Sequence, residues 1–307
     1  MKLGKREEGQ AVVLTVFALV AMLGMCALVL DVGSWFRTHR RLQATADAAA
    51  LAGAQDLPAD PSGAQSLALS YANQNGGDVL SADIVVSSTY NANDTISVKA
   101  ARNESGNFSK VLGINSASLV ATAKARVDSP SQAKFVAPMV VNCNHLLIQN
   151  CNGNHIPIFN VPTLLNYDPL GAPGAFGMLN LGGAQNPGSS EEANWILHGF
   201  NQYLGLGNYF SDPGAKFSSQ NIQSALDARI GTVLLFPVYR TLSGTGQNAV
   251  YEIIGWIGFH LTSYVVAGNN AVLAGYFTEF IAQGILPGGS GSGSPSTFGV
   301  KSIQLIG

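Results

Sequence analysis

The chain has few charged residues for its length, and this scarcity excludes several classes of protein. Charged side chains make up 11% of the 307 residues, and 16 Lys and Arg nearly balance 18 Asp and Glu, so the net charge is -2. Proteins that bind nucleic acids normally carry a basic patch or stripe. The composition therefore predicts no nucleic-acid partner. Glycine is abundant, with 35 residues, which favours a turn-rich architecture dominated by strands.

Catalytic motifs are missing as well. The sequence contains neither G-x-S-x-G nor H-E-x-x-H, which mark two large groups of hydrolases. An enzyme built on this chain would have to use isolated groups, and a lone histidine on an apolar stretch is more often structural. The isolated candidates are His198, His260, Glu252 and Glu279. We expect no catalytic residue, no cofactor site, no metal site and no small-molecule substrate.

Only three cysteines are present. Cys26 lies in an apolar run, where we expect it to behave as a small apolar side chain. Cys143 and Cys151 enclose seven residues, and His145 and His155 lie beside them. Thiolates and imidazoles suit tetrahedral zinc, but the spacing is not that of a familiar zinc finger or ribbon. We favour a Cys143–Cys151 disulfide, with a zinc site or free thiols as the alternatives.

The longest apolar run extends from Ala11 to Leu30 and closes on Asp31. Twenty residues at 1.5 Å rise give a helix of about 30 Å, the thickness of the bilayer's hydrocarbon core. The run is longer than the apolar part of a signal peptide. It therefore predicts a transmembrane helix. Two environments are open for the carboxylate of Asp31. It can reach the lipid headgroups, or it can pair with a cation of a neighbouring subunit.

The charges around the run do not decide its orientation. Three basic residues precede it and three follow it, namely Lys2, Lys5 and Arg6, then Arg37, Arg40 and Arg41. A short tail stays easily in the cytoplasm, long domains translocate regardless of nearby charge, and a disulfide suits an oxidising exterior. We expect a single-pass membrane protein with a cytoplasmic N-terminus and its bulk in the periplasm or outside the cell.

The apolar run passes without a proline into an alanine-rich, helix-forming stretch that ends near Gln55. Small side chains recur there at three- and four-residue spacing, which places them on one helix face. Such a face lets another helix approach closely. We expect this small-residue seam to pack against a partner helix; its members are Leu42, Ala46, Ala49 and Gly53.

Three parts are expected, in an α+β fold. Residues 1–57 form the transmembrane anchor and its long, pilin-like extension, and residues 58–128 form a small α/β layer of helix, hairpin, short helix and strand. Residues 129–307 form a glycine-rich, β-dominated domain, sandwich-like or barrel-like, with two short helices starting near Ser189 and Ser218. Glycines alternating with apolar residues over 174–188 indicate a strand whose backbone has close neighbours.

The N-terminal block contains several recognisable motifs, namely Gly9-Gln10, the apolar run, LDVG at Leu30 to Gly33, Arg41-Leu42-Gln43, and ADAAALAGA from Ala46 to Ala54. Together they resemble the corresponding segment of the TadE/TadG-like proteins of Flp (tight adherence) pilus assembly. Cleaved pilins of that kind carry Glu where this chain has Leu14, so we expect an anchor that is retained, as in TadG-like members.

The resemblance implies a structural or assembly component of a Flp-type pilus. Its N-terminal helix would pack in the bilayer, and its exterior domains would dock on other pilus-assembly proteins or pilins. The alternative is an envelope-anchored adhesion or ligand-binding protein that has the same kind of anchor.

Overall fold

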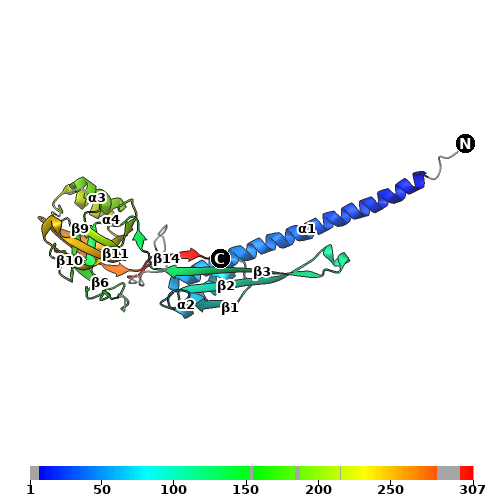
Figure 1. Cartoon of the computed structure of the whole chain (residues 1–307), viewed down its shortest axis with the longest axis horizontal. Helices are drawn as coiled ribbons and strands as arrows, with labels where there is room; N and C mark the ends of the chain where they lie inside the picture. Colours follow the sequence, from blue (N-terminus) through cyan, green and yellow to red (C-terminus); the bar gives the residue numbers. More distant parts are fainter. Residues whose placement is uncertain (1–6, 153–154, 184–186, 215, 282–297, 307) are drawn as a thin grey trace. The chain divides into compact units, whose positions relative to one another are not determined.

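The computed structural model describes residues 7–152, 155–183, 187–214, 216–281 and 298–306. Lys2, Lys5 and Arg6, on which the predicted orientation partly rests, lie outside these residues. The chain divides into two compact units (Figure 1). The first unit comprises Met1–Arg126 with Gln304–Gly307, and the second comprises Val127–Ile303. The predicted anchor and the small α/β layer thus fall in one unit.

The first unit is organised by one long helix. Helix α1 covers Glu7–Gly53 and continues as the 3-10 helix η1, Ala54–Asp56. Its sequence contains no proline and is rich in alanine, the strongest helix former. The second helix, α2 (Pro61–Gln74), starts with proline at its first turn, and the Asp60 side chain accepts the Gly63 N–H at 2.9 Å. The predicted long helix is confirmed.

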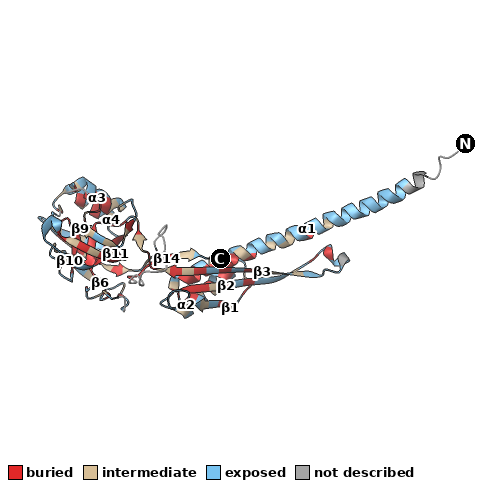
Figure 2. Cartoon of the chain, in the orientation of Figure 1, coloured by how far each residue is buried: buried red, intermediate tan, exposed pale blue. Residues whose placement is uncertain are grey.

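An antiparallel sheet completes the first unit. Its strands are β1 (Val79–Ser87), β2 (Thr95–Ser105) and β3 (Ser116–Asp128), with the 3-10 helix η2 (Ser109–Leu112) between β2 and β3. The Ile306 N–H donates to the Lys124 carbonyl at 2.9 Å and so adds the chain's end to β3. The C-terminal part of α1 is buried where α2 and β2 pack against it, whereas its N-terminal part is exposed (Figure 2).

The second unit is a closed sheet. Hydrogen-bonded neighbours follow the order β10-β5-β7-β6-β12-β11, and β11 pairs again with β10, so the pairing forms a ring. Of the two alternatives that we considered, this is the barrel. The strands are β5 (Met139–Asn142), β6 (Pro162–Tyr167), β7 (Ala175–Met178), β10 (Val233–Ser243), β11 (Val250–Ala267) and β12 (Asn270–Thr278).

The remaining strands are not members of the ring. β9 (Gly207–Phe210) pairs with the start of β11, and β13 (Phe280–Ile281) pairs in parallel with β14 (Val300–Leu305). β4 (Gln132–Ala133) and β8 (Leu204–Gly205) form a separate two-stranded sheet. The predicted strand over 174–188 is confirmed only at β7, and residues 184–186 of that stretch lie outside the described ones.

Aromatic side chains and two helices fill the core of the second unit. Phe236 on β10 stacks on Phe259 of β11, with ring centroids 5.1 Å apart. Helices α3 (Ser189–His198) and α4 (Gln220–Arg229) contribute Ile196 and Leu226 to the same core. At Gly177 of β7, an added Cβ would collide with the Tyr251 hydroxyl, which explains a glycine in this strand.

Candidate functional site

The apolar part of α1 is left uncovered by the residues that the structure describes. Side chains from Ala11 to Leu30 are exposed except for Ala27, which is half-buried. The helix Ala11–Asp56 is long and apolar enough to cross a membrane, and its most apolar 18-residue window has a mean hydropathy of 2.8 and is not buried. A row of exposed apolar side chains of this length requires an apolar solvent or partner.

Asp31 ends this exposed stretch and is itself buried, with 1% of its surface accessible. Its carboxylate accepts the backbone N–H groups of Asn107 at 3.1 Å, Phe108 at 2.8 Å and Ser109 at 2.6 Å. Phe108 caps η2 and Ser109 is its first residue, so their N–H groups have no partner within the helix. Asp31 therefore joins α1 to the loop between β2 and β3.

This contact argues against the second alternative for Asp31, pairing with a neighbour's cation, and leaves the first, a place at the headgroups, as a prediction. The carboxylate accepts N–H groups of its own chain, and its burial there leaves no access to a neighbour's cation. No sequence pattern near Asp31 predicts its hydrogen-bond donors, which lie more than seventy residues away in the chain. The loop sequence Gly-Asn-Phe-Ser at 106–109 indicates a turn and the start of a helix, but not the acceptor that caps it.

The small-residue seam is occupied by this chain's own elements. Leu42, Ala46 and Ala49 have exposed fractions of 2%, 0% and 0%, and Gly53 is also buried. An added Cβ at Gly53 would lie 2.7 Å from the carbonyl oxygen of Ala64 on α2. The seam does pack against a helix, but that helix is α2. It offers no surface to a second protein, because α2 and the sheet already cover it.

A different face of α1 remains open. Leu28, Val29, Val32, Gly33 and Phe36 line a shallow apolar hollow of about 400 Å³. Val29, Gly33 and Phe36 recur at helical spacing, so they form one face. An added Cβ at Gly33 would have no neighbour within 4 Å among the described residues. This open face has the small residue and the apolar rim that helix packing in membranes uses.

The open face and Asp31 lie in a segment that matches a known protein family, whereas the donors to Asp31 at 107–109 lie outside it. Residues 9–56 match the model of the family described as putative Flp pilus-assembly TadE/G-like. The TadE/G-like segment thus extends from the start of the exposed run through Asp31 to the end of η1. The match confirms the resemblance drawn from the sequence and supports a role related to pilus assembly. No curated protein matches the chain, and no solved structure does.

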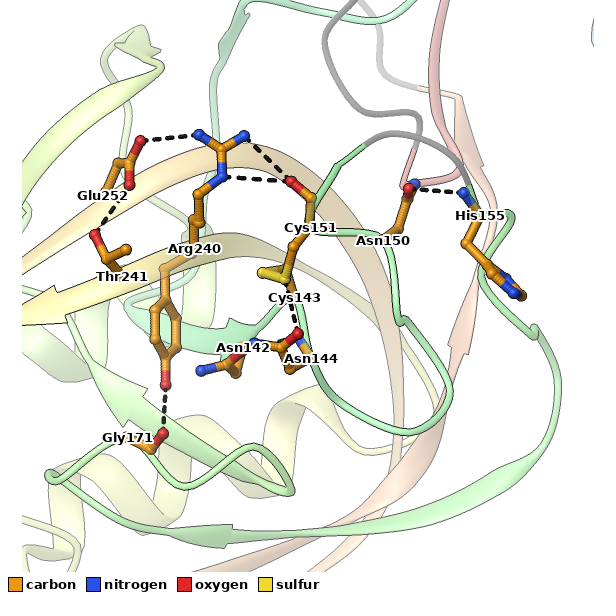
Figure 3. The surroundings of a disulfide bond; sticks show 11 residues. Asn142, Cys143, Asn144, Asn150, Cys151, His155, Gly171, Arg240, Thr241 and Glu252 are labelled. Carbon is orange, nitrogen blue, oxygen red and sulfur yellow. Dashed lines mark hydrogen bonds and ion pairs between the residues drawn. A yellow bond between two sulfur atoms is a disulfide. The ribbon is translucent and has the colours of Figure 1, made fainter.

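Outside the TadE/G-like segment, the second unit holds a disulfide between Cys143 and Cys151, the pairing that we favoured (Figure 3). It closes the turn after β5. The neighbouring His145 is buried against Phe277, with ring centroids 5.1 Å apart, and its Nδ1 accepts the Leu147 N–H at 3.1 Å. Burial lowers the pKa of His145. The zinc alternative is not supported, because the sulfurs are joined to each other.

The isolated enzyme candidates have ordinary structural partners. Glu252 binds the guanidinium of Arg240 at 3.1 Å (Figure 3), Glu279 binds Lys301 at 3.2 Å, and His260 stacks on Tyr276. Among the residues that the structure describes, no group of three or more His, Cys, Asp or Glu is placed to hold a metal ion. These contacts explain the candidates as surface ion pairs and ring packing.

His198 is the exception, because it lies at a cavity of about 450 Å³. Lys134 and Arg229 line the same cavity together with apolar side chains, and no acidic residue is among its described lining. Burial lowers the pKa of Arg229, whose guanidinium donates to the Val233 carbonyl. The cavity is therefore suited to an organic anion, and its described lining offers no carboxylate for acid–base chemistry.

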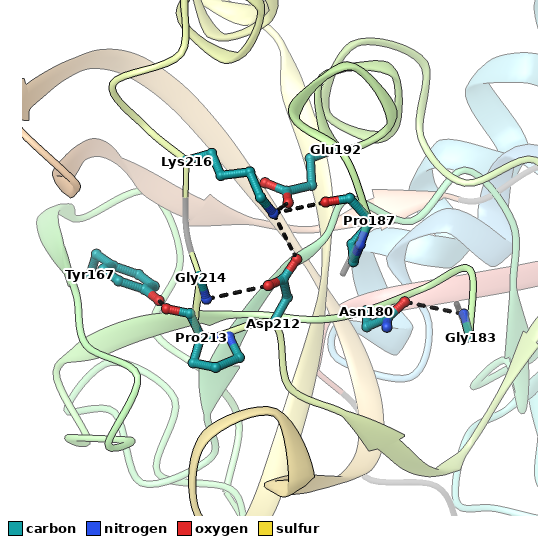
Figure 4. Close-up of polar contacts among 9 residues, drawn as sticks. All are labelled: Tyr167, Asn180, Gly183, Pro187, Glu192, Asp212, Pro213, Gly214 and Lys216. Atoms are coloured by element: carbon teal, nitrogen blue, oxygen red, sulfur yellow. Dashed lines mark hydrogen bonds and ion pairs between the residues drawn. The ribbon is translucent and has the colours of Figure 1, made fainter. Parts of the chain in front are cut away.

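A buried ionic cluster in the second unit was not predicted from the sequence. Lys216 contacts the carboxylate of Glu192, lies 3.5 Å from that of Asp212, and donates to the Pro187 carbonyl at 2.8 Å (Figure 4). Glu192 on α3 is fully buried, and this burial, only partly offset by Lys216, raises its pKa to about 7. The cluster joins α3 to the loop before α4 and faces no described cavity that suggests chemistry.

Proposed function

We propose that this chain is a membrane-anchored structural or assembly component of a Flp-type pilus. The family match over residues 9–56 carries the proposal, because it falls on the helix that, among the described residues, is exposed and apolar over the length of a bilayer. Ala11–Leu30 spans the membrane, the short N-terminal tail is cytoplasmic, and both folded units lie in the periplasm or outside the cell.

Docking on partners uses the open face of α1. Helices in lipid associate through close packing of small and apolar side chains rather than through a hydrophobic drive. The face around Val29, Gly33 and Phe36 is exposed and contains a glycine, whereas the small-residue seam is already covered by α2. The occupant of this face is a transmembrane helix of another pilus-assembly protein or of a pilin.

An exchange of the anchor tests this proposal. Residues 11–30 are replaced by an unrelated apolar sequence of equal length, and the exposed open-face residues Val32, Gly33 and Phe36 by Ala, Leu and Ala, while Asp31 and all other residues are retained. Pilus assembly is expected to fail while the protein remains in the membrane at its normal level. Normal pili with the foreign anchor would overturn the proposal that this span has specific partners.

A second candidate, an envelope-anchored adhesion or ligand-binding protein, is favoured by the cavity lined by Lys134, His198 and Arg229. Under that function any anchor of sufficient length would serve. The Arg229→Met variant would then abolish adhesion and leave pili intact, whereas under the pilus-assembly proposal it leaves pili and adhesion unchanged.

A further inference from the structure

The loop between β2 and β3 carries exposed apolar side chains. We call residues 107–114 the hairpin tip; it lies beside α1 (Figure 1). The exposed fractions are 49% for Phe108, 88% for Val111 and 45% for Ile114, and Lys110 is exposed between them. Exposed apolar side chains clustered on one loop indicate a surface that contacts something apolar.

The hairpin tip is a built structure rather than a loose connection. The Ser109 hydroxyl donates to the Ile114 carbonyl at 3.0 Å, and the Gly106 N–H donates to the Asn115 carbonyl at 3.0 Å. A side chain at Gly106 would collide with the Ser109 hydroxyl. These contacts keep Phe108 and Val111 in place although Phe108 is half exposed and Val111 is almost fully exposed.

Asp31 fixes the tip at one level along α1. It accepts the N–H groups of Phe108 and Ser109, and it follows directly on Leu30, the last residue of the exposed apolar run. Ala27, one turn earlier on the same helix face, is half-buried. When Ala11–Leu30 fills the hydrocarbon core of about 30 Å, the tip lies where hydrocarbon meets the lipid headgroups.

We propose that the hairpin tip inserts into the lipid headgroup layer as a second membrane contact. Phe108, Val111 and Ile114 meet the upper acyl chains, and Lys110 extends its ammonium to lipid phosphates, the arrangement that amphipathic side chains adopt at this depth. The inference rests on the proposed transmembrane anchor. Two contacts restrain the tilt and rotation of the first unit about α1, which a single helix would leave free.

Site-directed spin labelling of the full-length protein in lipid bilayers tests this. Single cysteines replace Val20 in the span, Val111 at the tip and Val85 on β1, each in a Cys26→Ala background, while the Cys143–Cys151 disulfide stays oxidised. Val20, Val111 and Val85 are 60%, 88% and 52% exposed, so the labels replace no core packing. The measured quantity is collision with oxygen, which enriches in lipid, against collision with a water-soluble nickel chelate.

The label at Val111 is expected to collide several-fold less with nickel, and more with oxygen, than the label at Val85, and to lie shallower than the label at Val20. If the label at Val111 collides with both reagents as the label at Val85 does, while the label at Val20 is in lipid, then the tip is in water. That result would overturn the inference and leave the proposed anchor unaffected. Shielding of Val111 from both reagents would mean that a protein covers it, which also overturns the inference. A water-exposed label at Val20 would overturn the proposed anchor itself.

Discussion

The carboxylate of Asp31 and the backbone N–H of Ser109 lie 2.6 Å apart, although 78 residues separate them in the chain. This hydrogen bond closes the far end of the β2–β3 hairpin on α1. At the other end of the same face, Gly53 touches α2. α1 therefore contacts the rest of the first unit from Asp31, at the end of the apolar run, to Gly53, at its C-terminal end.

Replacing Asp31 by Ala removes the only acceptor that the described structure provides for the N–H groups of Asn107, Phe108 and Ser109 together. Since unpaired amide groups open and exchange more readily, we expect faster hydrogen exchange in the segment 106–115. Exchange in α2, which Asp31 does not touch, is expected to stay unchanged. Mass spectrometry of the full-length protein in detergent or bilayers measures both segments.

The conservative control is Asp31→Asn. One carbonyl oxygen remains able to accept an N–H, but the amide group brings donors that face other donors. Protection of the segment 106–115 is expected to fall between that of the native protein and that of Asp31→Ala. Equal protection in all three proteins would show that Asp31 does not hold the loop.

The sequence predicted α1 well because a continuous apolar run followed by alanine-rich helix formers is compatible with only one regular secondary structure, a helix. It could not predict the partners of α1. The seam around Ala46 has the pattern of a packing face, yet small side chains do not specify whether the covering helix belongs to the same chain. Asp31 is similar, since a carboxylate beside lipid can bind any donor and its partners are backbone groups, which leave no pattern of their own.

The barrel of the second unit shows the same limit. Strand-forming runs around β10 and β11 can be recognised in the sequence. Closure of the barrel, however, depends on the pairing of β11 with β10 and on the parallel pairing of Val238 with Val141. Pairings between distant strands are not encoded in local periodicity. The ionic cluster around Lys216 was missed for the same reason, because Glu192 lies on a different element.

A second buried carboxylate, Asp94, holds the turn between β1 and β2. Burial opposes its ionisation, but N–H groups from Asn91, Thr89 and Tyr90 outweigh burial and lower its pKa below 3.8. A lowered folded-state pKa contributes stability that is complete above 3.8 and is lost as the pH falls through the folded value. Asp94→Ala is expected to lower the free energy of unfolding by about 1–3 kcal/mol at pH 7.

Urea unfolding of the first unit, followed by Trp35 fluorescence, measures this at pH 7 and at pH 3. The difference between the native protein and Asp94→Ala is expected to shrink at pH 3, because protonation weakens the same contacts that the variant lacks. A difference that is independent of pH would contradict an ionised Asp94 in the turn.

In the second unit, Lys216 is the cation that offsets two buried carboxylates. Lys216→Met leaves Glu192 and Asp212, with side chains 0% and 2% exposed, without it. Breaking a buried ion pair from one side costs about 3–5 kcal/mol. Adding Glu192→Gln to Lys216→Met is expected to recover part of that loss. Unfolding followed by Trp195 and Trp256 fluorescence reports on this unit, and strictly additive losses would contradict the pairing.

The same cluster gives a pH dependence of opposite sign to that of Asp94. Burial raises the pKa of Glu192 from 4.5 to about 7, so the folded state binds a proton more tightly than the unfolded state does. The contribution of Glu192 to stability therefore decreases as the pH rises from about 4.5 to about 7. The Glu192→Gln variant should lose this slope, and an unchanged slope would place its origin elsewhere.

Reduction of the Cys143–Cys151 disulfide is expected to destabilise the second unit only modestly. The bond closes a short loop, with a sequence separation of 8, and chain entropy gives about 2–3 kcal/mol for such a closure. The intact protein should gain about two mass units on reduction, and the melting temperature of the second unit should fall by roughly 5–10 °C. A protein that holds stoichiometric zinc and gains no mass would contradict the disulfide.

Gly33 and Gly53 allow one substitution to separate packing inside the chain from packing against a partner. Both lie on α1, but an added Cβ at Gly53 would meet the Ala64 carbonyl and Ile96, whereas at Gly33 it would meet no described neighbour within 4 Å. Gly53→Leu is therefore expected to destabilise the first unit by about 1–3 kcal/mol through overpacking. Gly33→Leu should leave its unfolding unchanged or slightly more stable, since leucine favours helix over glycine.

The effect of Gly33→Leu on pilus assembly then tests whether the open face is a docking surface. Gly33→Leu fills the place where a partner helix would approach, so assembly and co-purification of pilus proteins are expected to drop although the variant folds and reaches the membrane. The Val85→Leu variant, on an exposed strand position of the same unit, should change neither. Normal assembly with Gly33→Leu would exclude the open face as the docking surface and leave the exterior units to make the contact.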